Sequence, residues 1–475
     1  MLYFNKTLVI YDIKQNLKAE LDEKNKKYFE YLEQFEKSKT LSNNSIILSN
    51  FYLVKKVNFK KNSIFLLISS GFARCISDYQ GNKNNTLILY DKNSGQFLSG
   101  TIGMIMGKCP WAWAISCKWN SLFIRFKIPD NLVASLNDIT ILNLHTRTKT
   151  DVTVRKPFLS EKKKNKFTIC VPPLYFYNNF LQLFIASEIW RLQGVSKIVY
   201  YYSSVSQDVF NLLKYYESEG LVTLIPLKSL PKNKNVDPNK SIYRYGHMSA
   251  INDCMNRVNS EYVTALDVDE FLYFTENNTF KNDIFIKMAD EIFEKQENLA
   301  GLVFKHFFAN LNMVYSKKDI KSDFNFLRSI FVIRRFRPTK FILRPERAVT
   351  IQSHTPSRVF PKFKLKKLNE KNAMVMHFRC NWVNRNVTNG HVKNFVLEKD
   401  IIQIRKKFAK IKKKLNVLKK FEFNLSVLDK IRKCVGKWKS KGCKVVDKLC
   451  KEKVWLMDNW VTGDEISSND KYYIL

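Results

Sequence analysis

Strands and helices alternate through residues 167–270, and this alternation constrains the fold more than any other feature of the sequence. Apolar, β-favouring runs predict strands within 167–177, 196–204, 221–227 and 261–270, and segments of helical spacing predict helices within 178–193, 206–220 and 246–260. Gly194 follows the first of these helices, as expected for a helix C-cap. Such alternation favours a mostly parallel α/β sheet, in which ligands bind at the carboxyl ends of the strands.

The rest of the chain divides into regions of different composition. Residues 1–45 are a charged segment that we interpret as an exposed helix or stalk, and residues 46–158 contain short apolar runs separated by turn signals, which predict a β-rich subdomain. The α/β domain then covers 165–395, and we expect its first strand to end in a loop at Pro172 and Pro173.

Residues 396–475 form a basic region that is predicted to be mainly helical. Within 396–453 there are 20 Lys or Arg against 6 Asp or Glu. The apolar residues recur at helical spacing and should pack on one face, opposite a solvated basic face. They are Ile404, Phe408, Ile411 and Leu415.

The whole chain is strongly basic, with 80 Lys and Arg against 43 Asp and Glu and a net charge of +37. Such an excess fits a polyanionic partner, such as nucleic acid or an anionic membrane, but it also fits a lysine-rich surface that keeps the protein in solution. We favour the second interpretation because lysine is spread along most of the chain. No aromatic stacking pattern or zinc-finger spacing accompanies the charge, so the sequence predicts no specific nucleic-acid partner.

The cysteines and the apolar segments bear on the cellular compartment. Nine cysteines occur without a C-x-x-C pair, which fits either free buried thiols or a few disulfides in an oxidising compartment. We find no run of about 20 apolar residues that would span a bilayer. The first 20 residues are interrupted by Lys6 and Asp12 and make a poor signal peptide, so no anchor or address is visible in this sequence.

The stretch "YVTALDVDEFLYF", residues 262–274, packs three carboxylates into four positions between two apolar runs. If the strand ends in Asp267 and Asp269, both side chains lie on one side of the pleat, because side chains alternate along a strand. Paired carboxylates suit a hard divalent cation, which in turn suits a diphosphate. The alternative is an acidic turn whose charges are solvated or paired with lysine.

Two classes of enzyme place Asp-x-Asp at a strand end. A phosphatase of the haloacid dehalogenase type uses the first Asp as nucleophile, normally after the first strand of its sheet. A nucleotide-sugar glycosyltransferase of the GT-A type uses the motif after the fourth strand to hold manganese against the donor diphosphate. The strand order here fits the glycosyltransferase.

Several long motifs, in order, resemble glycosyltransferase family 92, formerly called domain of unknown function 23. They are "CVPPLYFY", "LQLFIASEIWRLQGVSKIVYYYSSVSQDVFNLLKYYESEGLVTLIPL", "AINDCMNRVNSEYVTALDVDEFLY", "FILRPERAVTIQSH" and "MVMHFR". The resemblance covers about 165–390, and the region 46–158 is similar to the segment that precedes the core in animal members. One departure is His247 after Gly246, where the family pattern leads us to expect Gly-Gln.

The resemblance implies a GT-A fold and an inverting, metal-dependent transfer of galactose from UDP-galactose in a β1,4 linkage. The acceptor in animal members is fucose on an N-glycan core, whereas plant relatives extend galactan. The partners implied are thus a UDP-sugar donor and a glycan or glycoprotein acceptor, and the cofactor is Mn²⁺. Members usually sit in the Golgi as membrane-anchored proteins, so this chain is either incomplete at its N-terminus or a divergent copy without an anchor.

The resemblance also implies roles for the acidic stretch and for a late histidine. Asp269 should ligate the metal directly, and Asp267 should contact the ribose or the water on the metal. Glu270 is either a neighbour that supports these residues or an accessory acid. His377 in "MVMHFR" should complete the metal site, and His354 in "IQSHTP" is the competing candidate.

Further candidates concern the donor and the catalytic base. Phosphate could be bound by the basic side chains of "TKFILRPER", which are Lys340, Arg344 and Arg347, and the donor by Asn252 and Asp253. An inverting displacement needs a carboxylate base. Glu270 and Glu346 are candidates for it, and Asp323 competes with them, so the base stays unassigned.

A non-enzymatic alternative is a glycan-binding or scaffold protein that keeps the GT-A fold without activity. Intact Asp267 and Asp269 argue against this, since a protein that has lost catalysis is free to lose its metal ligands.

Overall fold

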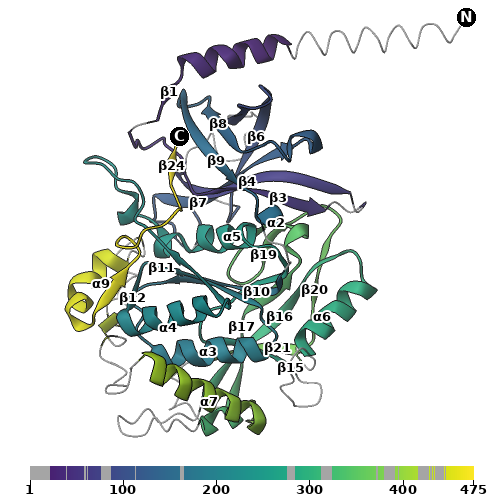
Figure 1. Cartoon of the computed structure of the whole chain (residues 1–475), viewed down its shortest axis with the longest axis vertical. Coiled ribbons are helices and arrows are strands. Elements are labelled where there is room, and N and C mark those ends of the chain that lie inside the picture. Colours follow the sequence, from purple (N-terminus) through teal and green to yellow (C-terminus); the bar gives the residue numbers. More distant parts are fainter. Residues whose placement is uncertain are drawn as a thin grey trace, which may run out of the picture.

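The computed structural model describes most of the chain. The described residues are 22–38, 40–57, 60, 62–75, 87–107, 109–112, 114–160, 165–274, 284–311, 324–370, 373–378, 391–393, 395–415, 427, 430–431, 433, 443 and 446–475. A helix over residues 22–34, mostly exposed, comes first, in agreement with the prediction for the charged N-terminal segment. An all-β region and then an α/β region follow it, and the C-terminal segment runs back to the all-β region (Figure 1).

The all-β region is a closed barrel. Its strands are β3 (Phe51–Val57), β4 (Ser63–Arg74), β5 (Leu87–Asp91), β6 (Phe97–Met104), β7 (Trp119–Ile128), β8 (Asp138–Asn143) and β9 (Thr148–Arg155). They pair in the order β3-β4-β7-β6-β5-β8-β9, and β9 then pairs with β3, so that the sheet closes. Closure removes the open strand edges. Alternate apolar side chains, such as Leu67, Ile124 and Ile139, fill the core. The β-rich character predicted for 46–158 is confirmed.

The α/β region contains the alternating elements that the sequence predicted. They are β10 (Asn165–Leu174), α3 (Phe180–Leu192), β11 (Lys197–Tyr202), α4 (Gln207–Ser218), β13 (Val222–Pro226), α5 (His247–Arg257) and β14 (Ser260–Ala265). Strands β13, β11, β10 and β14 lie side by side and parallel, so their carboxyl ends share one edge. Gly194, with a φ of 82°, follows α3 at the predicted C-cap.

The second half of this sheet differs from the prediction of a mostly parallel sheet. Its elements are β15 (Glu270–Phe274), α6 (Ile284–Lys295), β16 (Leu299–Leu311), β17 (Ser329–Leu343), β20 (Lys364–Lys367), β21 (Ala373–Phe378) and β22 (His391–Lys393), with the small hairpin β18 (Ala348–Ile351) and β19 (Pro356–Val359) beside it. The order continues β14-β17-β16-β21-β15, and β17 is antiparallel to both β14 and β16. The sheet is therefore mixed beyond β14.

The predicted loop at Pro172 and Pro173 is wrong, because β10 continues through both prolines to Leu174. Proline has no N–H to donate to the ladder, and the register shifts between Val171 and Leu174 accordingly.

The basic C-terminal region is helical only in part. Its elements are α7 (Glu398–Leu415), α9 (Val446–Val454), β23 (Trp460–Thr462) and β24 (Tyr473–Ile474). Ile404, Phe408 and Ile411 of α7 are buried against the α/β core, as the helical spacing predicted. The two short strands were not predicted. β23 pairs with β12 (Ser204–Ser206), and β24 pairs with β2 (Ile47–Leu48) beside the barrel.

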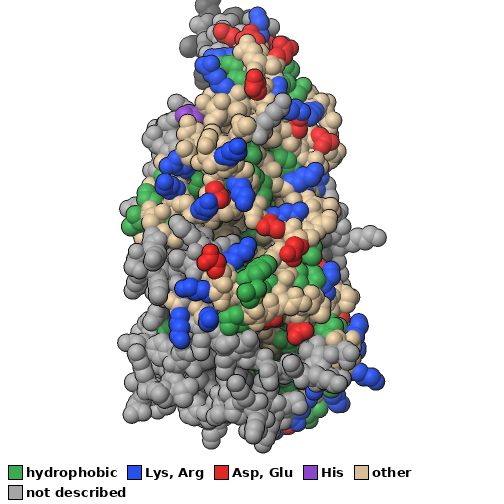
Figure 2. Space-filling model, turned by 90° about the vertical axis from the view of Figure 1, so that its left-hand side faces the viewer, with side chains coloured by type: hydrophobic (Ala, Val, Ile, Leu, Met, Phe, Trp, Pro, Cys, Tyr) green, Lys and Arg blue, Asp and Glu red, His purple; other side chains and the backbone are tan. Residues whose placement is uncertain are grey.

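On one face of the molecule the charged side chains are dispersed. Figure 2 shows Lys and Arg side chains over the whole described part of one face, with Asp and Glu side chains among them. This distribution fits the interpretation of the net charge as a solvated surface. Among the described helices, none is both long and apolar enough to cross a membrane.

The described cysteines include three disulfide pairs. Cys75 pairs with Cys109, Cys117 with Cys443, and Cys170 of β10 with Cys254 of α5. The alternative of disulfides, left open by the sequence, is therefore the one found, and the third pair ties α5 to the central strand of the parallel half.

Candidate active site

Asp267 and Asp269 lie in the turn between β14 and β15, at the carboxyl edge of the parallel strands. The expectation that a strand ends in these residues is wrong, since β14 ends at Ala265. The Glu270 N–H donates to the Asp267 carbonyl at 3.0 Å and closes the turn. The Asp267 and Asp269 side chains are 43% and 24% exposed, while Val268 between them is buried. The turn, rather than the pleat, presents both carboxylates to solvent.

A buried layer of Glu270, His306 and His377 lies beneath this turn. Glu270 of β15 is directly opposite His377 of β21, and β16 brings His306 alongside. His306 Nε2 is 3.2 Å from Glu270 Oε1 and 3.1 Å from His377 Nδ1. The other ring nitrogen of His377, Nε2, is 3.1 Å from Asp269 Oδ2. His377 therefore connects the buried layer to the exposed carboxylate.

Lys340 of β17 is the positive partner of the acidic stretch. Its Nζ lies 2.6 Å from Glu270 Oε2 and 3.7 Å from Asp267 Oδ2, and it donates to the Ala265 carbonyl at 3.4 Å. Lys340 is fully buried and Glu270 nearly so. The pair fits the need of a buried charge for a close, hydrogen-bonded counter-charge.

The electrostatics of this pair keep Glu270 ionised. Burial alone would raise the pKa of Glu270, but the Lys340 ammonium and the imidazoles of His306 and His377 hold it well below its usual range. Burial alone would lower the pKa of Lys340, yet Glu270 and then Asp267 raise it. Both members of the pair are thus charged at neutral pH.

The residues fit a divalent metal at the exposed edge. Asp269 Oδ2 and His377 Nε2 face each other, and carboxylate with imidazole is a ligand set that manganese accepts. The second ring nitrogen of His377, Nδ1, is 3.1 Å from His306 Nε2, which in turn is 3.2 Å from Glu270 Oε1, so His306 links His377 to the carboxylate beneath it. Glu270, His306 and His377 also lie close enough to share an ion. In that buried group, however, Glu270 is already paired with Lys340.

His354 lies in the turn between β18 and β19. Its carbonyl accepts from Thr339 Oγ1 at 2.9 Å, and its Nδ1 is buried without a hydrogen-bond partner. Burial, followed by the charge of Lys340, lowers the pKa of His354 to about 4, so the ring is neutral. Within the described residues His354 makes no hydrogen bond or ion pair with Asp269, whereas His377 does.

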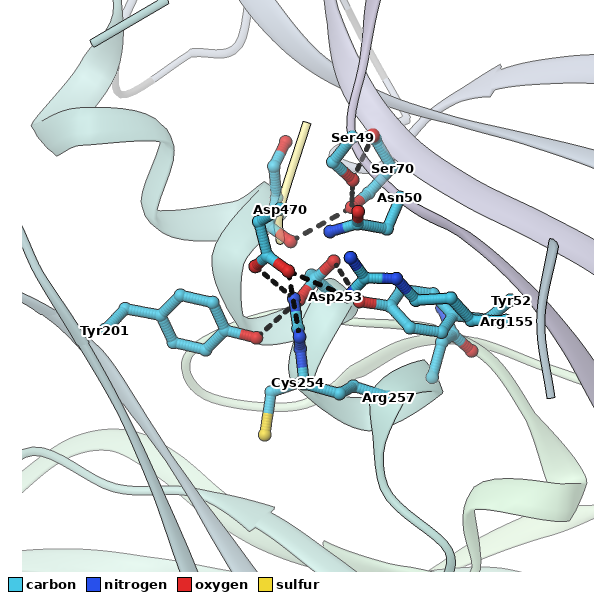
Figure 3. A network of polar contacts seen from close by, with 12 residues as sticks. Ser49, Asn50, Tyr52, Ser70, Arg155, Tyr201, Asp253, Cys254, Arg257 and Asp470 are labelled. Carbon is cyan, nitrogen blue, oxygen red and sulfur yellow. Dashed lines mark hydrogen bonds and ion pairs between the residues drawn. The ribbon is translucent and has the colours of Figure 1, made fainter. Parts of the chain in front are cut away.

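Asn252 and Asp253 of α5 are not brought to the acidic turn. The Asn252 amide accepts from the Ile351 N–H and donates to the Ile351 carbonyl, which fastens α5 to β18. Asp253 belongs to a separate network of Asp253, Arg257, Asp470 and Arg155, hereafter the brace (Figure 3). Its carboxylate contacts Arg257 and accepts from the hydroxyls of Tyr52 and Tyr201.

Arg344, Arg347 and Glu346 lie toward the opposite end of β14. Leu343 pairs with Val263, and β17 is antiparallel to β14, so the residues after Leu343 approach the start of β14. There the Arg344 guanidinium is 3.6 Å from Glu261 and 3.9 Å from Glu346, and Arg347 donates to the Leu299 carbonyl. Of the basic candidates, the structure brings only Lys340 to the acidic turn.

Sequence reasoning missed His306 and found no base. A single histidine in the apolar run "FKHFFAN" carries no local signal, because its role depends on β16 lying beside β21. Glu270 is buried and paired, Glu346 is remote from the turn, and Asp323 lies outside the described residues.

Comparison with known proteins places the site in a family. The model of glycosyltransferase family 92 matches residues 165–425, more than half of the chain, and includes the acidic turn, Lys340 and His377. The chain belongs to glycosyltransferase family 92.

Two further comparisons are more distant. The glycosyltransferase family 92 protein F13G3.3 of Caenorhabditis elegans is 24% identical over 163 residues, which cover 33% of this chain and 30% of that relative's length. The crystal structure of S. aureus TarS is similar with a TM-score of 0.24 and 13% identity, over 45% of this chain and 37% of TarS.

Proposed function

We propose that this family 92 member is a manganese-dependent, inverting glycosyltransferase of the GT-A type, which transfers galactose from UDP-galactose to a glycan acceptor in a β1,4 linkage. The observation that carries the metal and nucleotide part of the proposal is the Asp269–His377 contact beside the carboxyl ends of the parallel strands, where such folds bind nucleotides. The galactose donor, the inversion and the β1,4 linkage are proposed from the family membership. Asp267 lies beside it with the exposure that a contact to ribose requires.

The chain's own residues have separate tasks in this proposal. Asp269 and His377 would hold Mn²⁺, and bound Mn²⁺ would neutralise the charge that develops on the departing UDP. His306, held by Glu270, orients His377 from beneath, and Lys340 keeps Glu270 ionised. Glu270 is too buried to reach an acceptor hydroxyl, so the carboxylate base must be another residue.

We further propose that the protein works in the lumen of the Golgi. The support is the family membership together with the disulfides among the described cysteines, since disulfides persist in oxidising compartments.

Calorimetry with UDP, in the presence of Mn²⁺ or EDTA, tests the metal assignment. We expect UDP binding to require Mn²⁺ and to be lost in Asp269→Asn. Asp138→Asn on the barrel surface is the matched control and should bind UDP like the wild type. Unchanged UDP affinity in Asp269→Asn, with and without EDTA, would exclude this metal site.

Activity is tested separately by release of galactose from UDP-galactose. Hydrolysis by the wild type that stops on addition of EDTA supports the enzyme. Binding of UDP without hydrolysis or transfer to any glycan acceptor would favour the inactive glycan-binding alternative.

A further inference from the structure

The segment Tyr243–Gly246, directly before α5, has an unusual backbone. Arg244, Tyr245 and Gly246 have φ values of 42°, 54° and 74°, so three consecutive residues lie in the left-handed region. For the two residues that are not glycine this costs about 1–2 kcal/mol each. Such strain persists only where the surroundings hold it, and it is often found at ligand-binding sites.

Aromatic packing holds the segment from both sides. The Tyr243 ring lies edge-on against Trp111, 4.9 Å between centroids, and the Tyr245 ring is 5.2 Å from Tyr175. Gly246 packs so closely on the barrel that a Cβ there would lie 2.5 Å from the Phe72 ring. The barrel and the end of β10 therefore fix the backbone around Arg244.

Arg244 lies at the same edge of the sheet as the acidic turn. Its guanidinium is 5.3 Å from the Tyr243 ring centroid. Burial raises the pKa of Tyr175 and of Tyr243; the charge of Arg244 opposes both shifts, and the charge of Asp267 adds to both. The ring contact gives the same placement, because Tyr245 packs on Tyr175, which directly follows the carboxyl end of β10.

We propose that Arg244 binds the diphosphate of the nucleotide-sugar donor, on the side of the site away from His377. The proposal rests on the proposed function and adds a residue to it. A guanidinium matches phosphate oxygens with two parallel hydrogen bonds, which a lysine cannot reproduce. Because packing has already fixed the backbone, little further conformational entropy is lost when the diphosphate binds.

Variants Arg244→Lys and Arg244→Gln test this with two probes, UDP and uridine, both in the presence of Mn²⁺. We expect Arg244→Gln to weaken UDP binding by about 10- to 100-fold and to leave the affinity for uridine within about twofold of the wild type. Arg244→Lys should give an intermediate loss. Arg358→Lys is the matched control, because Arg358 also lies over an aromatic ring, that of Phe123 at 5.5 Å. Thermal melting checks that each variant is folded.

The outcomes separate this inference from the proposed function. A wild type that binds UDP together with an Arg244→Gln variant of equal UDP affinity overturns the inference alone. Equal losses for UDP and uridine also overturn it, since Arg244 would then support the nucleoside or the fold. A wild type that binds no UDP overturns the proposed function and this inference with it.

Discussion

The acidic turn with its buried layer and the brace are both clusters of charged side chains that are at least partly buried, but their charges are balanced differently. In the brace, Arg257 joins Asp253 at 2.8 Å and Asp470 at 2.6 Å, and Asp470 also pairs with Arg155 at 2.7 Å. These charges come from α5, the C-terminal segment and the barrel, and they neutralise one another (Figure 3). Two arginines meet two aspartates, and no carboxylate remains for a cation.

At the acidic turn, three carboxylates meet one lysine. Lys340 compensates Glu270, which leaves Asp267 and Asp269 exposed with their negative charge only partly balanced. A divalent cation would complete the balance there. The comparison teaches that the acidic turn keeps the negative charge that a cation site would need, whereas the charges of the brace cancel and join segments of the fold.

The largest expected effect is that of Lys340→Met. It leaves Glu270 buried without its counter-charge and should lower the free energy of unfolding by about 3–5 kcal/mol, measured by chemical denaturation. The double variant Lys340→Met with Glu270→Gln should recover much of this loss. Lys56→Met is the matched control: Lys56 is equally buried but donates to the Pro345 carbonyl, and burial lowers its pKa to about 8. An equal loss in Lys56→Met would show that burial, not the ion pair, matters.

The brace should affect stability without affecting binding. Asp470→Asn is expected to cost about 1–3 kcal/mol of unfolding free energy, because the partly buried arginines lose a charged partner. UDP affinity of the folded variant should be unchanged. A loss of UDP affinity beyond about threefold, at full folding, would mean that the brace takes part in the site.

The same residue gives a pH test. Burial alone would raise the pKa of Asp470, but Arg257 and Arg155 hold it below its usual value. A lowered folded-state pKa contributes stability above the unfolded pKa of about 3.9, and this stability is lost as the pH falls through the folded pKa. Chemical denaturation between about pH 5 and pH 2 should therefore show that the free energy of unfolding falls less with acidification in Asp470→Asn than in the wild type.

His377→Ala and His354→Ala sharpen the comparison within the site. Because His377 contacts Asp269, His377→Ala should weaken Mn²⁺ binding by about 10- to 100-fold, measured by titration with paramagnetic detection. His354→Ala should leave Mn²⁺ affinity unchanged and chiefly lower the use of acceptor. The reverse pattern would transfer the ligand role to His354. Wild-type Mn²⁺ affinity in both variants would show that neither histidine is a metal ligand.

The smallest effect is expected on α7. Lys410 and Lys413 are exposed on its basic face, and their replacement by Gln should change the free energy of unfolding by less than about 0.5 kcal/mol. UDP affinity should not change either, because α7 packs on α3 and α4 and supplies no residue to the acidic turn. A loss of UDP binding in the folded variant would contradict this separation.

The sequence by itself determined the elements of the parallel half and the acidic turn. Period, caps and apolar runs are local properties, so 167–270 could be divided into strands and helices without knowledge of their contacts. The parallel direction of the predicted strands is enough to place Asp267 and Asp269 at the ligand edge. The strand order is not given by the sequence, because β14 pairs with β10 and not with β13, which precedes it in the chain.

Only the tertiary structure decided which charges meet. Arg344 and Lys340 are four residues apart on one motif, yet the antiparallel run of β17 carries them toward opposite ends of β14. His306 joins His377 only because β16 and β21 are neighbours. Asp253 is part of the brace because Tyr52 of the barrel donates to it and because its partner Arg257 also pairs with Asp470 near the C-terminus. Ion pairs between distant segments depend on strand order and burial, and a local sequence pattern determines neither of these.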